Sequence, residues 1–112
     1  MATGDAPVLE ALLEINATAL NRAELDAPTM LLVRLAALAA VDAPAISYLM
    51  HVGPAVEAGV QVEQVQDVLV TVAPIIGAPR VLAAAQNITD ALGIVIAISA
   101  ADAESEPASS GV

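Results

Sequence analysis

Residues 26–44 read DAPTMLLVRLAALAAVDAP and predict one complete helix together with the start of the next. Asp is a favoured N-cap residue, because its carboxylate accepts hydrogen bonds from the free N–H groups of the first turn. Proline is tolerated at the first helical position, where no N–H is needed. Between the two Asp-Ala-Pro triplets, leucines recur at the spacing of one helix face. The stretch therefore predicts a helix over 27–40 that begins after Asp26, and another that begins after Asp42.

Similar signals divide the rest of the chain into further helices. A third Asp-Ala-Pro, at residues 5–7, marks the start of the first helix, and Gly59 and Gly77 offer left-handed positions that end two others. The β-prone run at 94–98 has no hairpin turn or alternating partner beside it. The predicted fold is an all-α bundle of about five helices, over 6–21, 27–40, 43–58, 62–76 and 78–100.

Two prolines and two segments of the chain add further predictions to this arrangement of helices. Pro54 and Pro74 are expected to kink or shorten their helices, since proline lacks an N–H and crowds the preceding turn. Residues 92–98 are apolar on nearly every side, which predicts a helix segment enclosed by neighbours. We expect a single domain over 1–100, followed by an acidic, disordered tail over 101–112.

The composition excludes several classes of function. The chain has 112 residues, and its net charge of −10 comes from 13 Asp and Glu against three Arg and no Lys. So little positive charge cannot neutralise a run of phosphates, which excludes nucleic-acid binding and disfavours anionic membranes. With no Cys and a single His, thiolate chemistry and Cys- or His-rich metal sites are excluded as well. We expect no metal and no cofactor.

Hydrophobic residues make up 58% of the chain, more apolar surface than a monomer of this size can bury. The excess predicts a subunit interface in a homo-oligomer. The most lipid-like stretch, residues 91–101, is shorter than the roughly 20 residues that span a bilayer. The first residues lack the basic and apolar regions of a secretory signal. We therefore expect a cytoplasmic location and no membrane partner.

The candidate catalytic residues cluster in the predicted helix over 43–58. Ser47 and His51 are four residues apart, so their side chains share one face and can approach hydrogen-bonding distance. A hydroxyl beside an imidazole is the minimum for base-activated nucleophilic or proton-transfer chemistry. The same spacing also occurs in helices without catalysis, where the histidine is a structural core residue. Tyr48, beside them, is a candidate for the wall of a pocket.

Arg34 interrupts a leucine-rich helix face, where an unpaired charge would be costly. One interpretation is a salt bridge to Glu10, Glu14 or Glu57, within or between subunits. The other is a clamp that binds the carboxylate of a ligand. The sequence leaves both interpretations open.

Three pieces of sequence occur together in a familiar order: Leu25-Asp-Ala-Pro-Thr-Met-Leu-Leu-Val-Arg34, then His51 followed by Glu57-Ala-Gly-Val, and then Gly77-Ala-Pro-Arg. In this order the chain resembles the carboxymuconolactone decarboxylase family, which includes the alkylhydroperoxidase D-like proteins. The resemblance implies an all-α fold whose subunits interlock as dimers and often assemble into trimers or hexamers.

In the peroxidase branch of that family a Cys-x-x-Cys-x-x-x-His motif supplies the redox pair. Aligning its histidine with His51 places the cysteines at Pro44 and Ser47, so both thiols are missing. A hydroxyl cannot form a sulfenic acid or a disulfide, and thiol peroxidase activity is therefore excluded. The decarboxylase branch needs no redox cysteine, only a proton donor and a group that holds an anionic lactone. The resemblance assigns these roles to His51 and Arg34.

Three hypotheses remain. The first is cofactor-free acid/base decarboxylation or lactone chemistry on a small organic acid, with His51 as acid/base, Ser47 orienting it, and Arg34 and Tyr48 lining the pocket. The second is a non-catalytic oligomeric scaffold or ligand-binding protein that kept the fold, and the third is a partner-binding subunit of a larger complex. An accessible His51 in an apolar pocket with Arg34 favours the enzyme. A sealed His51, with Arg34 paired to a glutamate, favours the scaffold.

Overall fold

The computed structural model describes the backbone of residues 2–105 and the side chains of residues 6–101. Within these residues all the regular elements are helices, and no strand is present. The predicted all-α fold of about five helices is confirmed. The helices are α1 (Ala2–Arg22), α2 (Ala27–Ala40), α3 (Ala45–Glu57), α4 (Val62–Ile76) and α5 (Ala78–Ser105).

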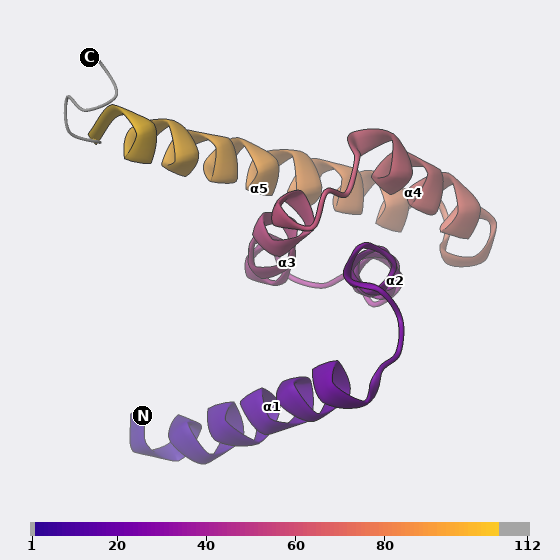
Figure 1. Ribbon diagram of the computed structural model, residues 1–112. Helices are drawn as coiled ribbons and strands as arrows, with labels where there is room; N and C mark the ends of the chain where they lie inside the picture. Colours follow the sequence, from indigo (N-terminus) through magenta and orange to yellow (C-terminus); the bar gives the residue numbers. More distant parts are fainter. Residues whose placement is uncertain (1, 106–112) are drawn as a thin grey trace.

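The core lies where α2, α3, α4 and α5 meet (Figure 1). α3 packs against α5, and α2 packs against α3 and α4. Leu35 of α2 and Tyr48 of α3 are the largest fully buried side chains, each 1% exposed. Val52 and Ala84 complete the centre of the cluster. Each of these helices thus turns one apolar stripe inward, as the leucine periodicity of α2 predicts.

α2 begins where the sequence predicts, because Asp26 caps it. The Asp26 carboxylate accepts hydrogen bonds from the hydroxyl of Thr29 at 2.8 Å and from the Thr29 amide at 3.2 Å. The hydroxyl and then the amide hold the pKa of Asp26 below its usual 3.8, since both stabilise the charged form. The exact start and end predicted for this helix are confirmed.

The triplet at 42–44 acts differently. Asp42 has a φ of +52°, the left-handed conformation that ends a helix. The Ala43 amide donates to the Leu38 carbonyl at 3.0 Å, which completes the C-terminal turn of α2. Asp42 therefore ends α2 instead of capping α3, and Pro44 occupies the N-cap position of α3. The predicted start at residue 43 is wrong by two residues for this reason.

The first triplet does not start its helix either. α1 extends back to Ala2 and contains Pro7. A proline this close to the end of a helix removes only one backbone hydrogen bond, so the preceding residues can remain helical. The predicted start at residue 6 is wrong.

The two glycine stops are confirmed. Gly59 and Gly77 follow the ends of α3 and α4 with φ angles of +84° and +91°, which favour glycine. Pro54 and Pro74 lie inside α3 and α4, and both helices continue past them by two or three residues. Neither proline ends its helix early.

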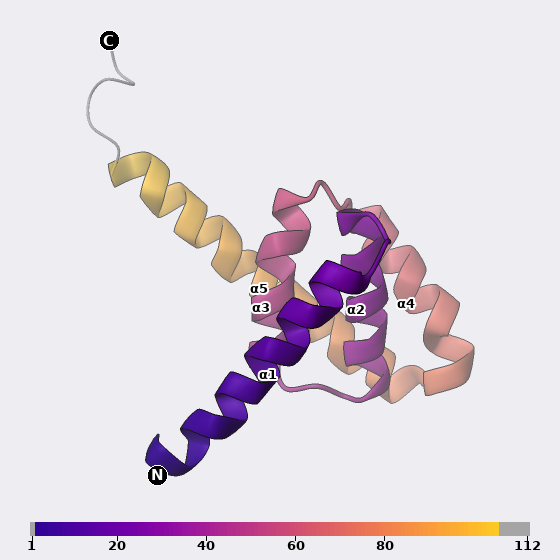
Figure 2. The ribbon, with the colours of Figure 1, turned by 60° about the horizontal axis from the view of Figure 1, so that its bottom comes forward.

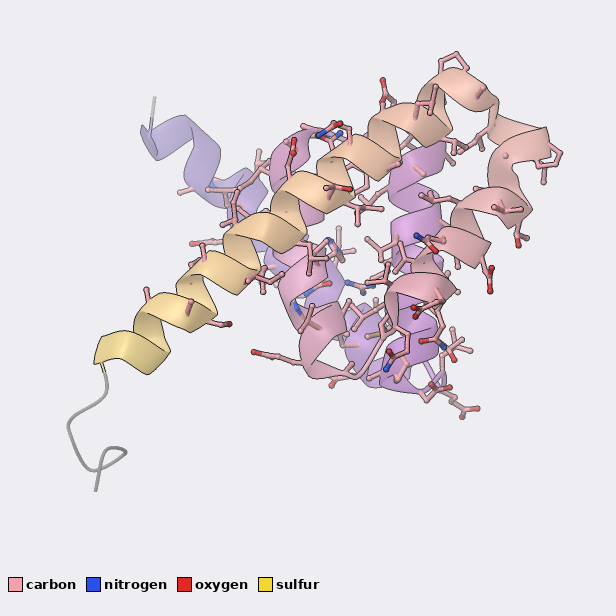
Figure 3. All side chains as sticks on the ribbon, turned by 90° about the horizontal axis from the view of Figure 1, so that it is seen from above. Atoms are coloured by element: carbon pink, nitrogen blue, oxygen red, sulfur yellow. The ribbon has the colours of Figure 1, made fainter. Side chains whose placement is uncertain are left out.

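The end of α5 differs from its prediction. The helix continues to Ser105, so residues 101–105 are helical instead of disordered, and residues 106–112 lie outside the described part. The run over 92–98 is not enclosed, because Ile94, Ile96 and Ile98 are exposed. This half of α5 projects beyond its neighbours (Figure 3). By length and composition alone, residues 78–101 could also cross a membrane, a test that core helices of soluble proteins pass too.

α1 also lies apart from the other helices, crossing over α2 and α3 (Figure 2). Its leucines and other apolar side chains remain about half exposed or more. The radius of gyration is 16.5 Å, against about 13 Å for a compact domain of this length. The chain thus has a compact four-helix core with two projecting, apolar helical segments.

Candidate functional site

A cleft of about 870 Å³ separates α1 from α2 and α3. This volume lies within the range of small-molecule sites, about 300–1,000 Å³. Most of the wall is apolar, with leucines of α1 facing Met30 and Met50. The polar side chains that line it are Asn16, Arg34, His51 and Glu57. The cleft therefore combines an apolar surface with a guanidinium, an imidazole, an amide and a carboxylate.

Arg34 is half-buried on α2, and its Nη1 donates a hydrogen bond to Asn16 Oδ1 at 2.6 Å. The partner that the structure gives it is thus a neutral amide of α1, and not one of the predicted glutamates of the same chain. An ion pair between subunits stays a prediction. Because a guanidinium has five N–H donors, this one bond leaves four donors of Arg34 for other partners.

His51 is half-buried on α3, and its Nδ1 lies 2.8 Å from the carbonyl oxygen of Ser47. A carbonyl only accepts, so Nδ1 carries a proton and donates it to this bond. The remaining ring nitrogen, Nε2, is therefore the atom through which His51 accepts or releases a proton. A fixed Nδ1 also restricts rotation of the ring, as a base in a catalytic site requires.

Ser47 orients His51 through its backbone and not through its hydroxyl. The predicted serine–histidine hydroxyl contact is therefore replaced by a bond that any residue at position 47 could supply. Tyr48 lies in the core, 1% exposed, and is not among the residues that line the cleft. Its burial, and secondly the charge of Asp42, raise the pKa of Tyr48 above its usual 10.0. Arg34 and His51 line one cleft, whereas neither Ser47 nor Tyr48 is among its lining residues.

Two further polar residues line the cleft, and neither is a candidate site residue from the sequence alone. Asn16 lies on a helix without a recognisable motif, and its contact with Arg34 joins segments 18 residues apart. Glu57, expected from the sequence as a salt-bridge partner of Arg34 and as part of the Glu57-Ala-Gly-Val stretch, lines the same cleft as His51. Among the residues described, no group of three or more His, Cys, Asp or Glu side chains is placed to hold a metal ion. The arrangement is suited to anion binding and proton transfer.

No curated protein and no solved structure matches the chain. Residues 6–91 match the family described as the Carboxymuconolactone decarboxylase family. The matched segment contains α2, α3 and α4, most of α1 and half of α5, and includes both Arg34 and His51. Since this match covers most of the sequence, the chain belongs to the carboxymuconolactone decarboxylase family.

Proposed function

We propose that this protein performs cofactor-free acid/base chemistry, decarboxylation or lactone conversion, on a small organic acid bound in the cleft between α1, α2 and α3. The observation that carries the proposal is that Arg34 and His51, from two different helices, line one apolar cleft. Among the side chains that the structure describes, the hydrogen-bond partner of Arg34 is the neutral amide of Asn16 and not a carboxylate. This is the arrangement expected of an anion-binding site next to a proton donor.

In the proposed reaction, Arg34 binds a carboxylate of the substrate through two parallel N–H donors. The bond between the lactone ring and a second carboxylate breaks, and its electron pair enters the conjugated system of the lactone. Carbon dioxide leaves, and protonated His51 delivers a proton from Nε2 to the substrate carbon. The proposed decarboxylation involves no net oxidation or reduction, so it needs neither a redox thiol nor a redox cofactor.

The overall charge of −10 opposes the approach of an anion. The local environment acts in the other direction, because apolar walls lower the effective dielectric around Arg34 and strengthen its attraction for a carboxylate. The repulsion by the whole chain grows with the charge of the substrate. A substrate with one or two carboxylates and an apolar ring is therefore expected to bind better than a polyanion does.

We further propose that two copies of the chain associate through α1 and the projecting half of α5. Both segments expose apolar side chains, among them Leu12, Leu13 and Ile96, and exposed apolar surface on this scale is typical of an interface. Association would cover the open side of the cleft and exclude water from Arg34 and His51.

The test of activity compares the wild type with His51→Gln and Arg34→Gln on 4-carboxymuconolactone and a panel of lactones and β-keto acids. Loss of a general acid lowers kcat by about 10²–10⁴-fold. Loss of a charged hydrogen bond to the bound carboxylate raises KM by roughly 10–100-fold. Arg22→Gln is the matched control, because it makes the same change of charge outside this cleft. All variants must keep the wild-type oligomeric mass.

The outcomes separate the hypotheses. Turnover by the wild type that survives His51→Gln would refute His51 as the acid. If the wild type converts no member of the panel and binds none of them in calorimetry, the non-catalytic scaffold replaces the proposed enzyme.

The proposed interface is tested by light scattering after size-exclusion chromatography. The double change Leu12→Gln and Leu13→Gln should lower the molar mass, whereas Glu10→Gln, which introduces the same residue on the same helix, should not. A monomeric wild type would refute the proposed association.

A further inference from the structure

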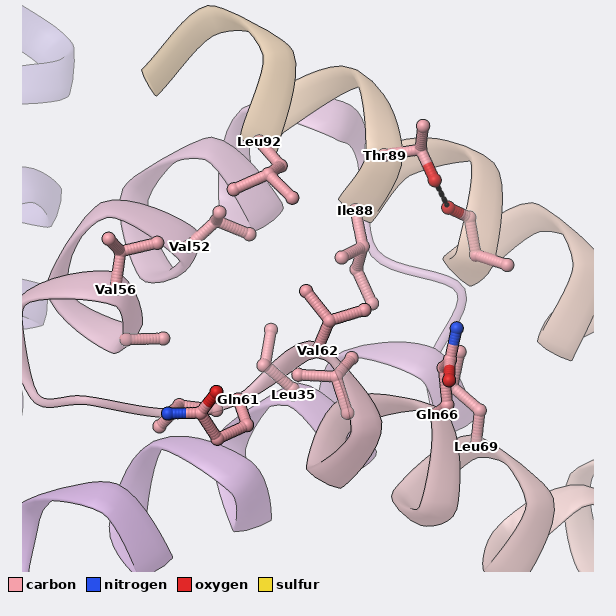
Figure 4. A pocket seen from close by; sticks show the side chains of 14 residues that line it. Leu35, Val52, Val56, Gln61, Val62, Gln66, Leu69, Ile88, Thr89 and Leu92 are labelled. Atoms are coloured by element: carbon pink, nitrogen blue, oxygen red, sulfur yellow. Dashed lines mark hydrogen bonds between the residues drawn. The ribbon is translucent and has the colours of Figure 1, made fainter. Parts of the chain in front are cut away.

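A second cavity opens between α3, α4 and α5 on the side of the core away from α1. Its volume is about 200 Å³, and it shares no lining residue with the Arg34–His51 cleft. The floor consists of buried core residues, including Leu35 and Val52. Figure 4 shows Val52, Ile88 and Leu92 converging on the same space from α3 and α5. The cavity is therefore a pocket that opens at the surface and whose floor reaches the packed core.

The lining of this second cavity selects for a neutral ligand. No Asp, Glu, Arg or His is among the residues that line it. A charged molecule would lose its hydration there without gaining a counter-charge, which costs several kcal/mol. An apolar cavity of about 150 Å³ stays free of water and binds benzene or xenon. A space of about 200 Å³ accordingly suits a molecule built on a single six-membered ring.

One side of the cavity is polar. Gln61, Gln66 and Thr89 lie at its exposed rim. The Thr89 hydroxyl already donates to the Ala85 carbonyl at 2.8 Å, and the Gln61 side-chain nitrogen lies 3.4 Å from the Gly59 carbonyl. The amide of Gln66 offers both a donor and an acceptor. A ligand with one neutral polar group could bond to Gln66 while its apolar part occupies the interior.

We infer that this cavity binds a small, uncharged, largely apolar molecule carrying a single hydroxyl or carbonyl group. A helix from a second copy of the chain is too wide to enter, because an α-helix with its side chains is about 10 Å across. The site is separate from the proposed catalytic cleft and does not depend on the activity proposed there.

The experiment uses cyclohexanol as the probe and follows the methyl NMR signals of Val52, Ile88 and Leu92 in the full chain. We expect saturable shifts with a dissociation constant of about 1 mM or lower. Cyclohexanecarboxylate has the same ring with a charge, and it should bind at least about tenfold more weakly.

Two variants localise the binding. Ala85→Leu fills the cavity with a larger side chain and should abolish the shifts, whereas Ala37→Leu makes the same change at an exposed position of α2 and should not. Gln66→Met changes only the exposed rim, so the fold is kept, and it should weaken cyclohexanol about fivefold, the value of one neutral hydrogen bond.

Three results of the binding experiment would overturn the inference. They are the absence of saturable shifts up to about 10 mM cyclohexanol, equal binding of the carboxylate, and binding unaffected by both Ala85→Leu and Gln66→Met. Intermolecular NOEs that place a second copy's side chain against Ile88 and Leu92 would also overturn it, because the space would then be part of an interface.

Discussion

Replacing Leu35 with alanine should destabilise the protein strongly, because this side chain forms both the centre of the core and the floor of the inner cavity. Leu35 is 1% exposed, so the three carbons lost in Leu35→Ala are all buried. At about 0.8 kcal/mol per buried carbon, their transfer accounts for about 2.4 kcal/mol. The new space adjoins an existing cavity of about 200 Å³, so the neighbouring helices cannot readily close it. The cost of this unfilled space raises the expected loss in the free energy of unfolding to about 3–5 kcal/mol.

The assay is urea denaturation followed by circular dichroism at one fixed protein concentration, since association couples stability to concentration. Leu82→Ala on α5 is the matched control. Leu82 is 69% exposed, so the same deletion should cost less than about 1 kcal/mol. If Leu35→Ala loses no more free energy of unfolding than Leu82→Ala does, the assignment of Leu35 to the core is incorrect.

Three further outcomes are expected. Asp26→Ala should lower the urea midpoint at pH 7 more than Asp26→Asn, which keeps an N-cap acceptor. The folded-state pKa of Asp26 lies below 3.8. The stabilisation that its carboxylate provides is therefore complete above pH 3.8 and is lost as the pH falls through the lower folded-state pKa. If Asp26→Ala were destabilised as much at about pH 2 as at pH 7, this assignment would be contradicted. Tyr48, the single tyrosine, should titrate above pH 10.0 by ultraviolet absorbance, chiefly because of burial, and Asp42→Asn should lower that midpoint. The stabilisation that the buried, neutral Tyr48 side chain provides is complete below pH 10.0 and is lost as the pH rises through its folded-state pKa. A titration midpoint at or below pH 10.0 would be evidence against a buried phenol. Gly77→Ala should cost about 1–3 kcal/mol because φ +91° and ψ 154° suit glycine alone. Gly93 lies inside α5 with open space around an added methyl group, so Gly93→Ala should stabilise the protein by about 0.5–1 kcal/mol. Equal effects of Gly77→Ala and Gly93→Ala in thermal melts would refute both assignments.

The helix boundaries show how far sequence chemistry reaches. α2 and α4 begin and end at the predicted residues. Asp26 caps the start of α2 and Gly77 ends α4, and both act within a few residues of the helix end. The triplet at 42–44 contains the same residues as the one at 26–28 but does something else. There the preceding helix requires a left-handed residue to end it, and Asp42 supplies that conformation. A tripeptide alone does not indicate which of two neighbouring helices it serves.

The candidate site was only half predictable. Arg34 and His51 were identified as polar interruptions of apolar faces, and they line one cleft. The orienting group on His51 is a backbone carbonyl, which every residue possesses and no side-chain pattern indicates. Asn16 was missed because its bond to Arg34 depends on how α1 crosses α2.

The sequence alone determined the all-α class, the capped start of α2 and the two glycines that end helices, because each depends on the chemistry of adjacent residues. The composition alone showed that redox cysteines are absent. Packing among distant segments decided the rest. It buried Tyr48 in the core, left the apolar run of α5 exposed, and formed a cavity without charged side chains whose floor includes Leu35. A helical sequence specifies which side chains share a face, but the face that meets a partner depends on the relative placement of whole helices. That placement is a balance of many weak contacts across the chain, and no short stretch of sequence contains it.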